Sequence, residues 1–148
     1  MTDRIEKTIE LKASPERVWQ ALTDHEEFGQ WFRVKLDGPF VPGALSNGHM
    51  TWPGYEHVKW RARVLRMDRP SLFSFSWHPY AIDPEVDYSA EPETVVEFRI
   101  EPNGAGTRLT VTEAGFDALP PHRQPEALRM NSSGWATQLE NVRVHVDG

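Results

Sequence analysis

The stretch Pro125–Val146, PEALRMNSSGWATQLENVRVHV, determines how the rest of this sequence is interpreted. Its apolar residues recur at helical spacing, which places them on one stripe and predicts an amphipathic helix. The stripe consists of Leu128, Trp135, Leu139, Val142 and Val146. Most of the chain before it alternates like strands, and an apolar helix stripe must be covered. We therefore expect this helix to lie across a sheet.

The middle of the same stretch, Asn131–Gly134, consists of residues that favour helices poorly. Two interpretations of these residues are open. Either the helix begins late, near Ser133, or Gly134 lets another group come close to the helix backbone.

The composition is that of one globular domain. The chain has 148 residues, of which 39% are apolar and 26% charged, so we expect a single domain over residues 1–148 with one core and room for a pocket. Six tryptophans indicate a wide apolar interior. The net charge of −6 disfavours binding to phosphate backbones, so we expect no nucleic-acid partner.

The absence of cysteine excludes disulfides, thiolate zinc sites and cysteine-ligated iron–sulfur clusters. The six histidines show no metal-ligand spacing, so we expect neither a metal nor another cofactor. There is no apolar run long enough to span a membrane, and Met1 leads into a charged strand without a signal peptide. We expect a cytoplasmic protein that is not inserted in a membrane.

Alternating apolar and polar residues predict strands at residues 5–11, 45–52, 57–67, 72–78, 93–101 and 106–114. Ser14-Pro15 and Asp24 each predict the start of a short helix. The proline-rich residues 79–92 predict a long loop. Short connections favour antiparallel pairing. The predicted fold class is α+β: a curved antiparallel sheet of about six to seven strands wraps around the long C-terminal helix, with two short helices after the first strand.

The order and spacing of several motifs resemble a known family. These motifs are ASPERVWQALT at 13–23, TVVEF at 94–98, GTRLTVT at 106–112, and Gly134-Trp135 followed by Leu139. Over Ile5–Val146 they resemble the START-like (SRPBCC) helix-grip superfamily, in the branch named after the activator of heat-shock protein 90 ATPase. Many relatives have a histidine three residues before this glycine. Here Asn131 stands in that place, so no role is transferred from the histidine.

This resemblance implies a helix-grip fold with a cavity between sheet and helix. Members of the superfamily bind lipids, hormones or polyketides there, a few catalyse reactions, and the eukaryotic namesake contacts a chaperone. Some relatives are named after an iron–sulfur reductase, but a chain without cysteine cannot hold that cluster.

The candidate ligand-binding residues are large apolar side chains expected to face the cavity, with the indole N–H groups of tryptophan as donors at its rim. They are Phe28, Trp31, Phe32, Trp52, Trp60, Phe75, Trp77, Phe98, Met130 and Trp135. His49 and Glu113 are the polar cavity candidates, because Glu113 shares the parity of an apolar strand face and His49 could face either side. Alternation places Glu97 and His78 on the outer face.

Three functions remain open from the sequence. The first is the binding of a small apolar or aromatic, lipid- or polyketide-like molecule in the cavity. The second is a co-chaperone-type interaction module, which the polar outer face disfavours. The third is a cyclase or hydrolase acting inside the cavity, although we identify no catalytic residue because no catalytic motif is present. The sequence leaves the oligomeric state open, a homodimer included.

Overall fold

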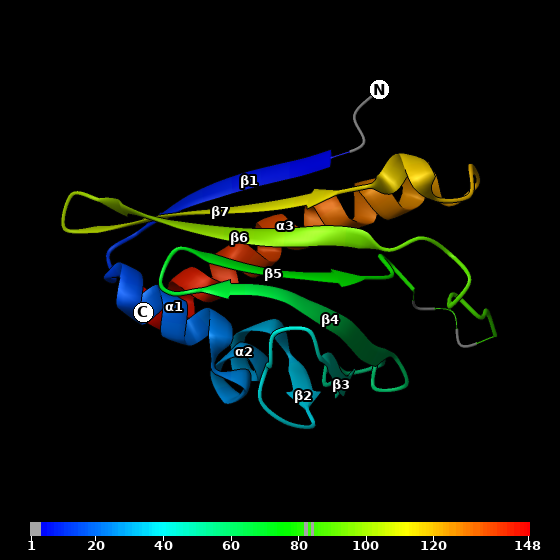
Figure 1. Ribbon diagram of the computed structural model, residues 1–148, viewed down its shortest axis with the longest axis horizontal. Coiled ribbons are helices and arrows are strands. Elements are labelled where there is room, and N and C mark those ends of the chain that lie inside the picture. Colours follow the sequence, from blue (N-terminus) through cyan, green and yellow to red (C-terminus); the bar gives the residue numbers. More distant parts are fainter. Residues whose placement is uncertain (1–3, 82, 84) are drawn as a thin grey trace.

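The computed structural model describes residues 4–81, 83 and 85–148. Seven strands form one sheet in the order β1-β7-β6-β5-β4-β3-β2 (Figure 1). Each neighbouring pair runs antiparallel. The strands are β1 (Arg4–Leu11), β2 (Val34–Leu36), β3 (Leu45–Met50), β4 (Lys59–Asp68), β5 (Leu72–Trp77), β6 (Thr94–Asn103) and β7 (Gly106–Ala114). The helices are α1 (Pro15–Thr23), α2 (His25–Phe32), the short 3-10 helix η1 (Phe116–Ala118) and α3 (Gln124–Asp147).

Helix α3 lies against one face of the sheet, here called the inner face (Figure 1). Helices α1 and α2 connect the edge strand β1 to the other edge strand, β2. The α+β class and the long helix across an antiparallel sheet are therefore confirmed. The sequence did not predict β2, whose three residues are too few to show alternation.

Helix α3 is continuous through Asn131–Gly134, so a late start near Ser133 is wrong. Tertiary packing explains this, since Trp135, Leu139 and Val142 are buried against the sheet and outweigh poor local propensity. The second interpretation was that Gly134 lets another group come close to the helix backbone, and no other described part of the protein does so. A Cβ added to Gly134 would have no other protein atom within 4 Å. The space beside Gly134 is open.

Hydrogen bonds fix the start of α1 and the end of α3. The Ser14 hydroxyl accepts from the backbone N–H of Arg17 and begins α1. At the end of α3, the Asp147 carboxylate accepts the backbone N–H groups of Lys12 and Ala13, at 2.8 and 3.0 Å. This contact fastens the end of the chain to the turn that follows β1.

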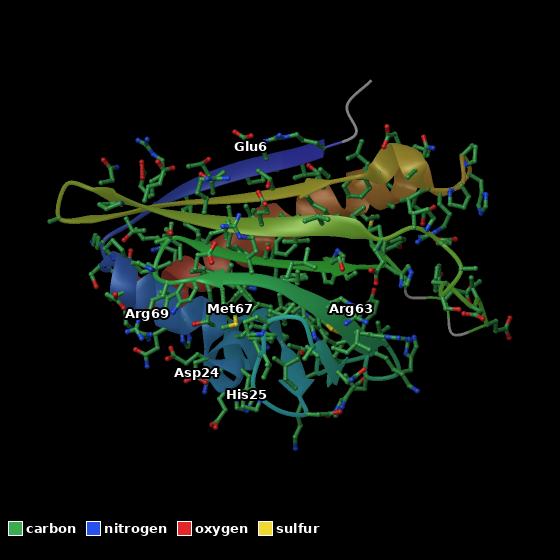
Figure 2. All side chains as sticks on the ribbon, viewed as in Figure 1. Glu6, Asp24, His25, Arg63, Met67 and Arg69 are labelled. Atoms are coloured by element: carbon green, nitrogen blue, oxygen red, sulfur yellow. The ribbon has the colours of Figure 1, made fainter. Side chains whose placement is uncertain are left out.

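The inner face of the sheet carries the core, and the outer face is polar. Phe73, Phe75 and Phe98 are fully buried on the inner face. Glu6 and Arg63, labelled in Figure 2, are exposed. Ser74 and Ser76 are buried although they alternate with the inward phenylalanines. They are short side chains between longer neighbours such as Arg66 and Glu97, which pair with Ser74.

The long loop predicted for residues 79–92 is confirmed for the part of it that the structure describes; residues 82 and 84 lie outside that part. Residues 1–3, on which the expectation for Met1 rests, also lie outside it. No helix among the described residues is long and apolar enough to cross a membrane.

Candidate functional site

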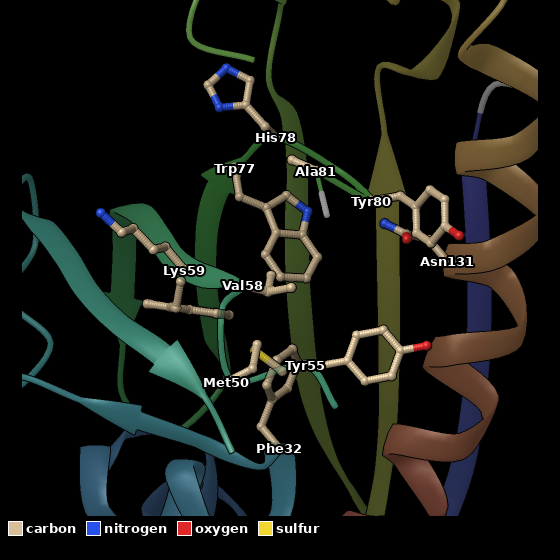
Figure 3. A pocket seen from close by; sticks show the side chains of 11 residues that line it. Phe32, Met50, Tyr55, Val58, Lys59, Trp77, His78, Tyr80, Ala81 and Asn131 are labelled. Carbon is tan, nitrogen blue, oxygen red and sulfur yellow. The ribbon is translucent and has the colours of Figure 1, made fainter. Parts of the chain in front are cut away.

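A pocket of about 210 Å³ opens between the ends of the central strands, the long loop and α3 (Figure 3). We call it the main pocket. Its apolar lining consists of Phe32, Met50, Val58, Trp60, Trp77 and Ala81. Its polar or amphipathic lining consists of Tyr55, Lys59, His78, Tyr80 and Asn131. Five different segments of the chain thus converge on one mostly apolar space.

A second space of about 140 Å³, here called the helix pocket, lies directly along α3. It is lined by Phe32, Trp77, Asn131, Gly134, Trp135 and Gln138. Phe32, Trp77 and Asn131 line both spaces, so the two are neighbours along one groove. The missing side chain of Gly134 contributes to the open volume of the helix pocket.

Glu113 is the polar centre beneath this groove. It lies on β7, opposite Val96 of β6, and is completely buried. Oε2 accepts from the Thr94 hydroxyl at 2.6 Å and from Trp77 Nε1 at 2.8 Å. Oε1 accepts from Trp135 Nε1 at 2.8 Å. Because a buried carboxylate is costly unless its oxygens are hydrogen-bonded, these contacts hold the two pocket tryptophans in place.

Asn131 completes the set of donors around Glu113. Its Nδ2 lies 3.0 Å from Oε1 and 3.2 Å from Oε2 of the carboxylate. The carboxylate can only accept, so the amide nitrogen must face it and Oδ1 must face away. Asn131 lines both pockets, and the atom it uses to contact Glu113 is Nδ2, which leaves Oδ1 out of that contact.

Four indole N–H groups do not point to the pocket rim, where the sequence analysis expected them, but donate to acceptors within the protein. Trp77 and Trp135 donate to Glu113. Trp60 Nε1 donates to the Ser46 hydroxyl, and Trp31 Nε1 donates to the Ala21 carbonyl. The expectation of indole donors at the pocket rim is therefore wrong for these four residues. Hydrogen bonds within the protein satisfy each N–H, so the three tryptophans that line the groove, Trp60, Trp77 and Trp135, offer it apolar ring atoms.

Arg123 fastens the long loop over the pocket mouth. Its guanidinium donates to the carbonyls of Pro79 and Tyr80, at 2.8 and 3.1 Å, and to the Glu91 carboxylate at 3.0 Å. It also lies 4.6 Å from the centre of the Tyr88 ring. His78 Nε2 is 2.9 Å from the Glu91 carbonyl oxygen. His78 is among the residues that line the main pocket, and Figure 3 shows its ring turned away from the other lining side chains.

The predicted ligand-binding residues fall into three groups. Phe32, Trp60, Trp77 and Trp135 line one or both spaces. Phe28, Trp31, Phe75 and Phe98 are buried behind them in a continuous aromatic cluster. Met130 and Trp52 lie away from both. Met130 is half-buried, and Trp52 is 36% exposed and stacks under the guanidinium of Arg33 at 4.8 Å.

The two polar candidates, His49 and Glu113, lie in different environments. His49 is exposed and lies on the outer side of β3. The residues that alternate with it point inward: Ser46 is buried, and Gly48 and Met50 are half-buried. Glu113 points inward, as its parity suggested, but it is enclosed by its donors and lines neither space in the described structure. Glu97, its neighbour across the sheet, is on the outer face near Arg99, so the two carboxylates do not face each other. Glu113 thus positions pocket residues and does not itself reach the groove.

Several pocket residues were not singled out from the sequence. Met50 ends β3, Tyr55 and Val58 precede β4, and Ala81 lies in the long loop. Met50 and Val58 fall within the predicted strands 45–52 and 57–67, but periodicity does not show that these strand ends meet the long loop. Asn131 was noted as a poor helix former and as a departure from a family pattern, but not as a residue that lines the groove.

Comparisons with known proteins identify the family of this chain and agree with its fold. The model of the family "Activator of Hsp90 ATPase homolog 1-like protein" matches residues 12–147. A crystal structure of a Mesorhizobium loti protein is 24% identical, with a TM-score of 0.77 over 97% of this chain and 96% of that one. The solution structure of the Aha1 dimer from Colwellia psychrerythraea is 18% identical, with a TM-score of 0.74 over 99% of this chain and 96% of that one.

A third similar structure is CalU16 from Micromonospora echinospora, 22% identical, with a TM-score of 0.67 over 97% of this chain and 75% of that one. At these identities the similar structures show a shared fold. No curated protein matches the sequence. With most of its length matched by the family model, from the end of β1 to the end of α3, this chain belongs to the family of Activator of Hsp90 ATPase homolog 1-like proteins, within the START-like helix-grip fold.

Proposed function

We propose that this protein binds a small apolar, aromatic molecule in the groove formed by the main pocket and the helix pocket. The observation that carries the proposal is the construction of the groove. Trp77 and Trp135 present ring faces to it while their N–H groups are held inward by a buried carboxylate. An aromatic wall fixed in this way is preorganised, which reduces the ordering cost of binding a flat ligand.

The volume of the main pocket limits the size of the ligand. Pockets for drug-sized ligands commonly measure about 300–1,000 Å³. The main pocket, at about 210 Å³, favours a ligand of one or two fused rings over a long lipid chain. A single cationic side chain, Lys59, is among the lining residues described for the main pocket, so charge contributes little to this preference.

The proposal is tested by filling the main pocket. Figure 3 shows the Val58 side chain near the middle of the lining residues, and Val58→Trp would occupy the space. Thermal unfolding with a panel of one- and two-ring aromatic compounds should show a rise in Tm for the wild type that this variant loses.

The matched control is His57→Trp, which adds the same ring at the exposed neighbouring residue, outside the lining of either space. It should keep the ligand-dependent rise. A panel that raises the Tm of neither the wild type nor this control, or that stabilises Val58→Trp equally, would reject the proposed site.

A protein-interaction role would use the outer face of the sheet, and this face supports it less than the groove supports ligand binding. The outer face of the sheet is lined by charged and polar side chains, including Arg4, Glu6, Glu97 and Arg99. A homodimer, by analogy with the Colwellia psychrerythraea dimer, is a separate proposal. Sedimentation as a single species of 17.0 kDa would remove it.

A further inference from the structure

We infer that the groove selects aromatic ligands that carry a hydrogen-bond donor, an O–H or N–H group, and that this donor is received by Oδ1 of Asn131. The inference rests on the proposed function and specifies the chemistry of its ligand. It assigns Asn131 as the residue that determines specificity and Glu113 as the residue that positions it.

The first step is the orientation of the Asn131 amide. Nδ2 contacts both oxygens of Glu113 at 3.0 and 3.2 Å. In the flipped orientation the amide oxygen would face a carboxylate with no proton between them, which is repulsive. Glu113 itself is fixed by Thr94, Trp77 and Trp135, so it cannot turn to suit a flipped amide. The direction of Oδ1 is therefore set by the buried carboxylate.

The second step is the availability of Oδ1. Among the described residues, no side-chain nitrogen or oxygen that is shut off from solvent lacks a hydrogen-bond partner. The hydrogen bonds of the Asn131 side chain in the described structure run from Nδ2 to Glu113. Oδ1 is thus not shut off from solvent, and Asn131 is one of the residues that line both spaces. A ligand that buries this atom without donating to it would leave an unsatisfied acceptor, which is costly.

The third step is the shortage of competing donors on the inner wall. The indole N–H groups of Trp60, Trp77 and Trp135 are already used within the protein. Tyr55 and Tyr80 line the main pocket with hydroxyls that can donate or accept, and they select neither kind of ligand. Lys59 is exposed and also lines the main pocket with a donor. The acceptor of Asn131 differs in that Glu113 dictates its direction, and this acceptor biases the groove toward donor-bearing rings.

A matched pair of probes tests this inference: 2-naphthol, which donates through its hydroxyl, and 2-methoxynaphthalene, which has the same ring system and cannot donate. Isothermal titration of the wild type should give a Kd for 2-naphthol about tenfold lower, equal to about 1.4 kcal/mol. In Asn131→Leu this ratio should fall close to one, and the Kd for the methoxy compound should fall, because the variant lacks the acceptor that this ligand leaves unsatisfied.

Two further variants address the positioning role. Asn131→His should keep the preference, because a neutral imidazole can donate to Glu113 with one ring nitrogen and accept with the other. Glu113→Gln should reduce the preference, because a neutral amide can face either end of the Asn131 side chain. Both effects concern the ratio of the two affinities, which a general loss of stability would not change.

The outcomes separate this inference from the proposed function. Equal affinity of the wild type for the two probes overturns the inference and leaves the binding function in place. A preference that persists in Asn131→Leu also overturns it, since the hydroxyl would then be recognised elsewhere. Failure of both probes to bind the wild type overturns the inference and the proposed function together.

Discussion

The indole nitrogen of Trp135 lies 2.8 Å from Oε1 of Glu113, so a hydrogen bond joins the final helix to the inner side of strand β7. Trp77 of β5 donates to the other oxygen of the same carboxylate, also at 2.8 Å. One buried side chain therefore connects a central strand, a strand near the sheet edge and the helix that crosses them. The groove is built around this connection, because both tryptophans line it.

We expect Glu113→Gln to lower the free energy of unfolding by about 2–4 kcal/mol, because an amide has one acceptor oxygen and turns its N–H₂ group toward other donors. Urea unfolding measures the change. Glu97→Gln, on the neighbouring strand but on the outer face, should change stability by less than about 0.5 kcal/mol. Similar losses in the two variants would contradict the role given to Glu113.

We expect Gly134→Ala to raise the free energy of unfolding by about 1 kcal/mol, because alanine favours a helix more than glycine does and no other protein atom lies within 4 Å of the added Cβ. Gly29→Ala in α2 is the contrasting variant. There the new Cβ would lie 2.4 Å from the Val34 carbonyl oxygen, so the substitution should destabilise. Thermal unfolding of the two variants should thus shift in opposite directions, and a destabilised Gly134→Ala would show that the space is not open.

The acid stability of the fold should depend on Glu27, which joins α2 to Arg17 of α1 and His145 of α3 at 2.7 and 2.8 Å. Burial raises the pKa of Glu27, but hydrogen bonds from His145 and Arg17 outweigh it and hold the pKa below the ordinary value of 4.5. A carboxyl group with a lowered folded-state pKa stabilises the fold above its ordinary pKa. This contribution is lost as the pH falls through the lowered value.

We therefore expect Glu27→Gln to be less stable than the wild type at pH 7 and to lose less stability on acidification below about pH 4.5. Urea unfolding at a series of pH values measures both effects. Glu101→Gln, at an exposed residue of β6, should instead reproduce the wild-type dependence. Parallel pH profiles for Glu27→Gln and the wild type would contradict this assignment.

We expect Arg123→Lys to loosen the loop over the pocket, because an ammonium group cannot reach the carbonyls of Pro79 and Tyr80 and the Glu91 carboxylate in the same fork geometry. Hydrogen exchange should become faster at the described amides of residues 88–91, by about fivefold to tenfold if about 1–1.4 kcal/mol of local stability is lost. Arg129→Lys, at an exposed residue of α3, is the control. Unchanged exchange in Arg123→Lys would show that the loop is held by other contacts.

The parts of the fold that periodicity encodes were predictable from the sequence. The stripe through Trp135, Leu139 and Val142 predicted a helix that needed a sheet, and these residues are buried as expected. The parity of Glu113 predicted its inward direction. In each case the position of a side chain follows from its own strand or helix.

The site depended on relations between distant segments, which periodicity does not encode. Asn131 is oriented by a residue 18 positions earlier. Arg123 holds carbonyls 43 and 44 positions away. The direction of an indole N–H group likewise depends on the position of its acceptor, which for Trp77 and Trp135 is Glu113 on strand β7. The sequence does not show this position, so it predicted indole donors at the pocket rim.

The most direct test of the account uses methionine methyl groups as reporters of the pocket. The chain has four methionines, of which Met50 lines the main pocket, whereas Met67 and Met130 line neither space. In a protein labelled with ¹³C at the methionine methyls, titration with 2-naphthol should move the Met50 resonance, shifted by the ring current of the bound ligand, and leave those of Met67 and Met130 in place. A titration that moves Met67 or Met130 while Met50 stays unchanged would contradict binding in the groove.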